Sequence, residues 1–304
     1  MGRRFAIRRR ILDLDPVRDF AEIYRLMGTH EFPWDMNQAL SFALFRTYAV
    51  PGIGGLLART GEFTERTQKR YDDTVLILDA VLEHGPASDE GRAAIRRMNQ
   101  MHRAHGVGND DLRYVLATFV VMPIRWIDAY GWRRLTETER IAGAEYYRDL
   151  GRRMGIRDVP TTWQAFAHLL DAYEREHFGF DAGARDVAES TLALFATFPP
   201  NHRLPEPLVR RISLAVMDAP LLDAFGFPHP GPVFRRLVRG GLRGRGRVVR
   251  LLPPRRDPYF ARRLPQIRTY PDGYEVADLG TFPAGCPVPH PRQESAARSP
   301  ERAG

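Results

Sequence analysis

Helical periodicity is the sequence feature that most constrains what this chain can fold into. Apolar side chains recur at intervals of three and four residues through most of the first 230 positions, the spacing that places them on one face of an α-helix. Alternating apolar and polar runs, which indicate strands, are scarce. The pattern predicts helices over residues 16–28, 36–48, 63–83, 88–105, 109–130, 136–154, 161–177 and 184–198. We therefore expect an all-α body over about residues 15–230.

Local signals mark where several of these helices begin and end. Thr136 stands three residues before Glu139, the spacing of a capping box, and Ser88 precedes two acidic residues that suit a helix N-terminus. Gly106 and Gly155 each come directly after an apolar-periodic run, where a glycine commonly ends a helix. The helix boundaries are therefore predicted by the same stretches that predict the helices.

The positive charge of the chain is concentrated near its C-terminal end. Of the net charge of +8, the stretch from Arg235 to Arg268 contributes twelve arginines against one acid, Asp257. We expect residues 231–304 to form an Arg/Pro/Gly-rich basic extension, with a turn at Pro271-Asp272-Gly273 between short extended segments and a largely disordered tail after about residue 280. Its arginines alternate with apolar pairs, as in a basic amphipathic helix on an anionic membrane surface. Glycines within the run oppose a helix, so membrane contact remains an open alternative.

The compartment is indicated by what the sequence lacks. Cys286 is the single cysteine, which excludes an intrachain disulfide and a cysteine metal cluster. The N-terminal stretch contains no apolar run of signal-peptide length, and no run reaches the ~20 apolar residues of a membrane span. We expect a cytoplasmic protein, with peripheral membrane contact as the alternative.

Two motifs resemble known sites without meeting their requirements. Gly52-Ile53-Gly54-Gly55 lacks the third glycine of a dinucleotide loop, since Leu57 stands there, and no strand precedes it. A turn between helices is expected instead. Glu174-x-x-His177 has the spacing of one half of a di-iron site in a helical bundle, but a second such pair is missing. Solvated charges at a helix end are the expected alternative.

Two histidines three residues apart raise a more specific question. In the stretch RRMNQMHRAHG, His102 shares a helix face with Ile95 and Met98, and His105 lies close to that face. A histidine on an apolar face is commonly a packing or interface residue. However, a haem iron also requires a single proximal nitrogen in a large dry pocket. Periodicity alone leaves both interpretations open for both histidines.

Two polar residues that could contact the same haem lie on the preceding predicted helix. Arg70 and Thr74 are four residues apart and therefore lie one above the other. A cation and a hydroxyl at the edge of an apolar face could meet a haem propionate or polarise a distal ligand. A surface arginine beside an exposed threonine is the alternative.

At these residues the chain resembles the oxygenases of the MpaB and rubber-oxygenase (latex-clearing protein) type. The resemblance rests on the ordered segments FALFRTYAVPGIGGLLARTGEF, RYDDT, IRRMNQMHRAHGVGNDDLRYVLATFVVMPIRWIDAYGWRRLTETE and LGRRMGIRDVP. It implies a single globin-like, multi-helix domain that binds haem b and uses dioxygen to cleave an olefinic bond in an isoprenoid. It also implies that His102 is the axial iron ligand, with His105 as the less favoured candidate, and that Arg70 and Thr74 serve in cofactor binding and catalysis. One departure concerns the substrate, because rubber oxygenases have lysine directly before that threonine and this chain has Asp73.

We therefore expect a haem-dependent oxygenase acting on a hydrophobic small molecule. Residues 119–127 offer aromatic and aliphatic side chains that could line a substrate channel, although core packing is the alternative. A second hypothesis is a non-catalytic helical binding protein whose basic tail contacts nucleic acid or a membrane. Nucleic acid is disfavoured, because the arginine run lacks interleaved aromatic residues for base stacking. A third is a haem-binding protein that has lost oxygenase activity.

Overall fold

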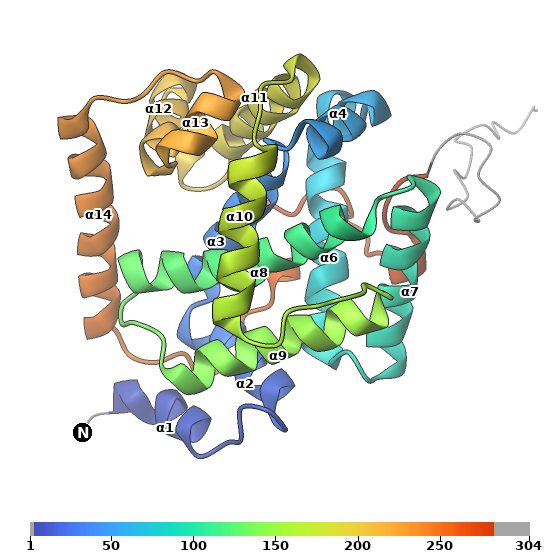
Figure 1. The fold of residues 1–304 in the computed structure, drawn as a ribbon. Coiled ribbons are helices and arrows are strands. Elements are labelled where there is room, and N and C mark those ends of the chain that lie inside the picture. Colours follow the sequence, from blue (N-terminus) through green and yellow to red (C-terminus); the bar gives the residue numbers. More distant parts are fainter. Residues whose placement is uncertain (1–2, 283–304) are drawn as a thin grey trace, which may run out of the picture.

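The computed structural model describes residues 3–282, and every regular element among them is helical (Figure 1). The all-α prediction is therefore confirmed for this part of the chain, whereas the globin-like arrangement stays a prediction. The α-helices are α1 (Ala6–Leu12), α2 (Phe20–Leu26), α3 (Pro33–Thr47), α4 (Pro51–Thr60), α5 (Glu62–Glu65), α6 (Thr67–His84), α7 (Asp89–Ala104), α8 (Asn109–Tyr130), α9 (Glu137–Arg153), α10 (Trp163–His177), α11 (Ala182–Thr197), α12 (Glu206–Val216), α13 (Ala219–Phe225) and α14 (Pro232–Leu251).

The residues that predicted the starts of two helices form the caps of those helices in the structure. Thr136 and Glu139 make both hydrogen bonds of a capping box at the start of α9. The Ser88 side chain accepts a hydrogen bond from the Gly91 backbone N–H at the start of α7. Helix ends that depend on contacts within a few residues were thus predictable from the sequence.

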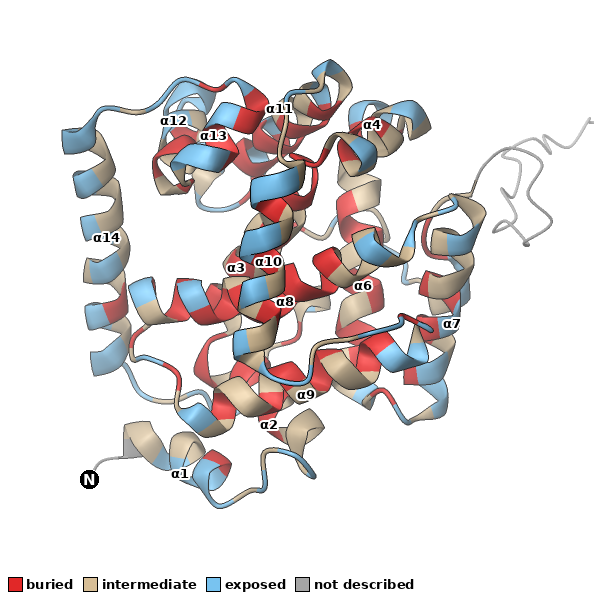
Figure 2. Cartoon of the chain, viewed as in Figure 1, coloured by how far each residue is buried: buried red, intermediate tan, exposed pale blue. Residues whose placement is uncertain are grey.

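Helix α8 forms the centre of the molecule. It crosses the middle of the fold, packed against α3, α10 and α9, and it is the most continuously buried helix in view (Figure 2). Tyr114 and Ile127 of α8 are fully buried, as are Phe166 and Leu170 of α10, which faces it. A smaller apolar cluster around Phe45 and Phe225 joins α3 to α11, α12 and α13. The helix predicted over residues 109–130 is therefore buried against neighbours on several sides.

The Gly52-Ile53-Gly54-Gly55 motif lies inside helix α4, so the expected turn was wrong. Pro51 occupies the first helical turn after the extended Val50, a position that suits proline. A Cβ atom on Gly54 would lie 2.4 Å from the Ala184 Cβ and 2.2 Å from the Tyr48 carbonyl oxygen. The glycine is therefore required by the close approach of α4 to α11, a contact between segments that are distant in sequence.

The C-terminal extension packs on the helical body. Despite its glycines, the arginine-rich run forms the 20-residue helix α14, which lies against α12 and α8. Gly246 allows α14 to approach the end of α8 closely, because a Cβ at this position would lie 2.6 Å from the carbonyl oxygen of Tyr130. The expected turn at 271–272 is present, but no strand flanks it. The division of the chain at residue 230 stays a prediction, and Cys286 with most of the expected disordered tail lies outside the described residues.

Residues 259–282 run along α6 and α7. Carboxylate and guanidinium side chains of these two helices bind the segment through hydrogen bonds. The Asp79 carboxylate of α6 accepts hydrogen bonds from the backbone N–H groups of Ala261 and Arg262, at 2.8 and 3.0 Å. Arg97 of α7 donates to the Leu279 carbonyl oxygen at 2.6 Å, and the Leu279 side chain is fully buried. This segment is therefore part of the folded body.

Within residues 3–282, no single helix is long and apolar enough to cross a membrane. Helices α3 and α4 meet that test only as a pair, and the pair is bent by 96°.

Candidate functional site

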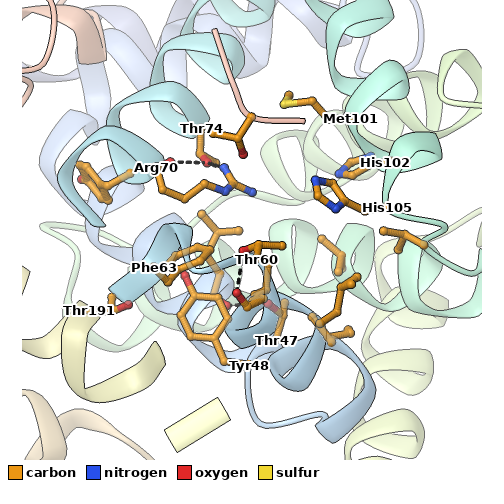
Figure 3. A pocket seen from close by; sticks show the side chains of 18 of the residues that line it. Thr47, Tyr48, Thr60, Phe63, Arg70, Thr74, Met101, His102, His105 and Thr191 are labelled. Carbon is orange, nitrogen blue, oxygen red and sulfur yellow. Dashed lines mark hydrogen bonds between the residues drawn. The ribbon is translucent and has the colours of Figure 1, made fainter. Parts of the chain in front are cut away.

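A largely apolar cavity lies between α4, α6 and α7, with α3, α8 and α11 completing its walls (Figure 3). All three predicted site residues, Arg70, Thr74 and His102, line it, and so does His105. Most other wall residues are aliphatic or aromatic, including Leu44, Leu56, Phe63, Leu112, Val115 and Phe195. The fold thus brings together side chains that the sequence placed on two separate helices.

His102 has the free nitrogen that a metal ligand requires. Its Nδ1 atom is buried and has no hydrogen-bond partner among residues 3–282. Burial, together with the nearby Arg70 and His105, lowers the pKa of His102 from 6.5 to about 4. The imidazole is therefore neutral at pH 7, the protonation state in which histidine binds metals. Buried polar atoms without partners are uncommon in folded proteins, and an unpaired nitrogen on a neutral imidazole is able to bind a metal.

His105 shares the cavity with His102 but occupies a different structural position. It is the residue directly after the last turn of α7, and its own backbone N–H caps that turn by bonding to the Met101 carbonyl oxygen. The predicted common face of the two histidines is thus confirmed. Their roles stay a prediction, although the unpartnered Nδ1 atom distinguishes His102.

Arg70 and Thr74 form a hydrogen-bonded pair on the opposite wall. Arg70 Nη1 donates to the Thr74 hydroxyl, which itself lies 2.9 Å from the Arg70 carbonyl oxygen and donates to it. Figure 3 shows the guanidinium extending from α6 toward the two imidazoles. Within the described residues this guanidinium contacts the Thr74 hydroxyl and the Phe63 ring rather than a carboxylate. The cavity therefore holds a positive charge that an anionic group on a ligand could balance.

Asp73, the departure from the rubber-oxygenase pattern, does not face the cavity. Its buried carboxylate pairs with Lys69 at 2.6 Å and accepts a hydrogen bond from the Tyr270 hydroxyl. The neighbouring Asp72 accepts bonds from the backbone N–H groups of Arg268 and Thr269, at 3.0 and 2.9 Å. The two adjacent acids thus hold the C-terminal segment instead of placing negative charge beside Arg70.

The C-terminal segment supplies a wall of the cavity that the sequence did not reveal. Thr281 lines the cavity together with Met101, and a Cβ on Gly280 would lie 2.0 Å from the Met101 sulfur. The same segment is held by Asp72 and Asp73, whose burial in the structure requires partners. Nothing local, however, identified residues almost 200 positions away as those partners.

Glu174 is part of a buried ion pair, so its expected role as a solvated helix-end charge was wrong. Both carboxylate oxygens accept from Arg46, at 2.5 and 2.6 Å, and the Tyr114 hydroxyl donates to one of them at 3.2 Å. Both members of the ion pair are less than a tenth exposed. The described residues contain no group of three or more histidine, cysteine or carboxylate side chains placed to hold a metal. A di-iron site is therefore not supported in this part of the chain.

The residues considered for a substrate channel pack in the core instead. Phe119, Val120, Trp126 and Ile127 are buried, and neither they nor Met122 line the His102 cavity. Trp126 lines a second cavity next to it.

Comparison with known proteins gives one family match and several relatives. Residues 34–251 match the catalytic domain described as ER-bound oxygenase mpaB/B'/Rubber oxygenase. An ER-bound oxygenase mpaB' of Penicillium brevicompactum is 29% identical over 257 residues, covering 79% of this chain and 60% of the relative. An ER-bound oxygenase mpaB of Penicillium roqueforti is 37% identical over 182 residues, covering 54% of this chain and 61% of the relative. The chain thus spans about 60% of the length of these relatives.

Proposed function

Because the chain belongs to the family of the ER-bound mpaB/B' and rubber oxygenase catalytic domain, and hence to the oxygenases, we propose that it is a haem b-dependent enzyme. We propose further that it uses dioxygen to cleave an olefinic bond in a hydrophobic small molecule such as an isoprenoid. One observation carries this proposal, the buried and unpartnered Nδ1 of a neutral His102 in an apolar cavity. The family match supports the proposed reaction class, and the state of His102 supports the proposed cofactor.

The side chains around the cavity fit a haem group by their chemistry. His102 would bind the iron, with His105 as the alternative, and the Arg70 guanidinium would pair with an anionic group of the cofactor. Bound haem would supply the iron at which dioxygen is activated. The protein's own contribution follows from the described contacts. The cavity's largely apolar walls would limit water around the reacting groups, and the hydrogen bond from Arg70 holds the Thr74 hydroxyl at the cavity wall.

The proposal is tested by the visible spectrum of the purified protein. We expect a Soret band that is lost in His102→Ala and retained in His105→Ala. Loss in His105→Ala with retention in His102→Ala would instead assign the axial ligand to His105. Protein that stays colourless after haem reconstitution would overturn the haem proposal altogether. Oxygen uptake over a panel of isoprenoids of increasing chain length then tests the substrate class.

We also propose that the protein contacts an anionic membrane peripherally through α14, whereas the cytoplasmic localisation stays a prediction. The outward face of this helix carries exposed apolar residues, among them Val233, Leu237 and Leu251, which are 68%, 69% and 86% exposed. Arg236, Arg243, Arg247 and Arg250 are exposed beside them, and α14 contains no acidic residue. Apolar side chains flanked by arginines suit insertion at a negatively charged lipid surface.

Co-sedimentation with vesicles tests this contact. We expect binding to phosphatidylserine-containing vesicles, little binding to pure phosphatidylcholine, and loss of binding in the double variant L237D/L251D. Val17→Asp is the matched control, because Val17 is 56% exposed but lies between α1 and α2. Equal sedimentation of the double variant and the control would exclude α14 as the contact.

A further inference from the structure

A second cavity of about 590 Å³ lies beside the His102 cavity. It is bounded by α3, α11, α12, α14 and the segment that follows α14. Its walls mix aromatic rings with amide and hydroxyl side chains, including Asn37, Gln38, Asn201, Ser213 and Gln266. Such a lining suits a ligand that is both apolar and capable of hydrogen bonding.

The two cavities share part of their walls. Ser41 of α3, Tyr71 of α6 and Phe195 of α11 line both of them. Tyr71 directly follows Arg70, so neighbouring residues of one helix face the His102 cavity and the partition between the cavities. Three side chains thus separate the space around His102 from the larger chamber.

The Tyr71 hydroxyl lies at this partition, within reach of three polar side chains. The side chain is 9% exposed, and its oxygen makes no hydrogen bond of ordinary geometry with residues 3–282. Polar side chains of Asn37, Ser41 and Gln266 surround it. A buried hydroxyl whose neighbours are polar but poorly aligned with it leaves room for a polar group of a ligand.

The chamber also contains a cation without an ion-pair partner. Arg245 and Arg255 both line it. Arg245 pairs with the buried Asp35 at 2.9 Å, whereas Arg255 lies over the Tyr259 ring at 4.9 Å and makes no ion pair within the described part of the chain. The positive charge of Arg255 is therefore available to an anionic ligand.

We propose that the second cavity binds the carboxylate head of a long unsaturated amphiphile, whose apolar chain passes between Ser41, Tyr71 and Phe195 toward His102. The inference rests on the proposed function, because it assigns the substrate class to the same oxygenase site. Arg255 would hold the carboxylate, and the amide and hydroxyl side chains would complete its hydrogen bonds. The apolar chain would lie where the larger chamber meets the His102 cavity.

Binding of cis-parinaric acid, a polyene carboxylate whose fluorescence rises in apolar surroundings, tests the proposal without requiring turnover. The full chain is titrated anaerobically, and parinaryl alcohol serves as the uncharged comparison. We expect the acid to bind more tightly than the alcohol. Arg255→Gln should weaken the acid by about three- to fivefold, the range for an exposed ion pair, and leave the alcohol unchanged. Arg256→Gln, an exposed neighbour outside the cavity, is the matched control.

The passage between the cavities is tested by chain length. Ser41→Phe should weaken binding of the long acid but not of octanoic acid, measured by displacement of the probe, because the short chain fits within the second cavity. If this variant fails to fold, the unaltered protein is tested instead with carboxylic acids of eight to eighteen carbons as competitors of the probe. Their affinity should keep rising for chains too long to fit within the second cavity. Equal binding of acid and alcohol, or a plateau at short chains, would overturn the proposal. Since none of these readouts uses haem, a colourless protein that binds the acid would reject the proposed function alone.

Discussion

Lys69 and Asp73 are paired one turn apart on α6, with Nζ 2.6 Å from Oδ2, on a different face from the cavity-lining pair Arg70 and Thr74. The two pairs have the same spacing but are rotated from one another by one residue, about 100° around the helix. The aspartate that replaces the lysine of rubber oxygenases is therefore directed at Tyr270 and the C-terminal segment. Asp73 thus takes part in holding the C-terminal segment and does not line the cavity.

Replacing Asp73 by lysine is expected to destabilise the protein. The Asp73→Lys variant would place a second cation beside Lys69 in a fully buried position and remove the acceptor of the Tyr270 hydroxyl. The free energy of unfolding should fall by roughly 3–5 kcal/mol, as for a broken buried ion pair. Urea denaturation measures the loss, and Asp73→Asn, which retains an acceptor oxygen, should lose less. Wild-type stability in Asp73→Lys would contradict the assigned role.

The stability of the haem-free protein should depend on pH through His102. In the folded state its pKa is lowered from 6.5 to about 4, so the unfolded chain binds more protons between these two pH values. Stability should therefore rise as the pH increases from 4 to 6.5, with His102 contributing up to about 3 kcal/mol of the change. Urea titrations at several pH values, compared with His102→Gln, isolate this contribution. His105→Gln is the control and should keep most of the slope.

Two alanine substitutions in α4 should have opposite effects. Gly54→Ala would force a Cβ into the Ala184 side chain and the Tyr48 backbone, and we expect a loss of roughly 1–3 kcal/mol. Gly52→Ala meets nothing within 4 Å and should stabilise the helix by up to about 1 kcal/mol. Thermal unfolding of both variants gives the comparison. A stable Gly54→Ala protein would show that α4 does not need to approach α11 this closely.

The C-terminal segment should open when Asp72 is removed. Asp72→Ala would leave the backbone N–H groups of Arg268 and Thr269 without their acceptor. We expect these amides to exchange hydrogen about tenfold faster or more, which corresponds to the loss of a buried hydrogen-bond acceptor. Exchange measured by mass spectrometry over residues 261–282 tests this. Asp89→Ala, which removes a carboxylate that is 92% exposed, should change nothing there.

The sequence by itself determined the helices, their caps and the residues that face one another along a single helix. The capping box at Thr136, the common face of His102 and His105, and the pair Arg70 and Thr74 all depend on residues within a turn or two of each other, and each was predicted. Family membership was also predicted from the sequence, and a match to the family over residues 34–251 confirms it.

Only the tertiary structure decided which helix faces meet. The contact of Gly54 with Ala184, the ion pair of Glu174 with Arg46, and the hold of Asp72 on Thr269 each join residues more than 100 positions apart. Local propensity contains no information about such partners, since burial and hydrogen bonding between distant segments are set by how the whole core packs. The same physical reason explains why the partition formed by Ser41, Tyr71 and Phe195 became visible only when α3, α6 and α11 were placed side by side.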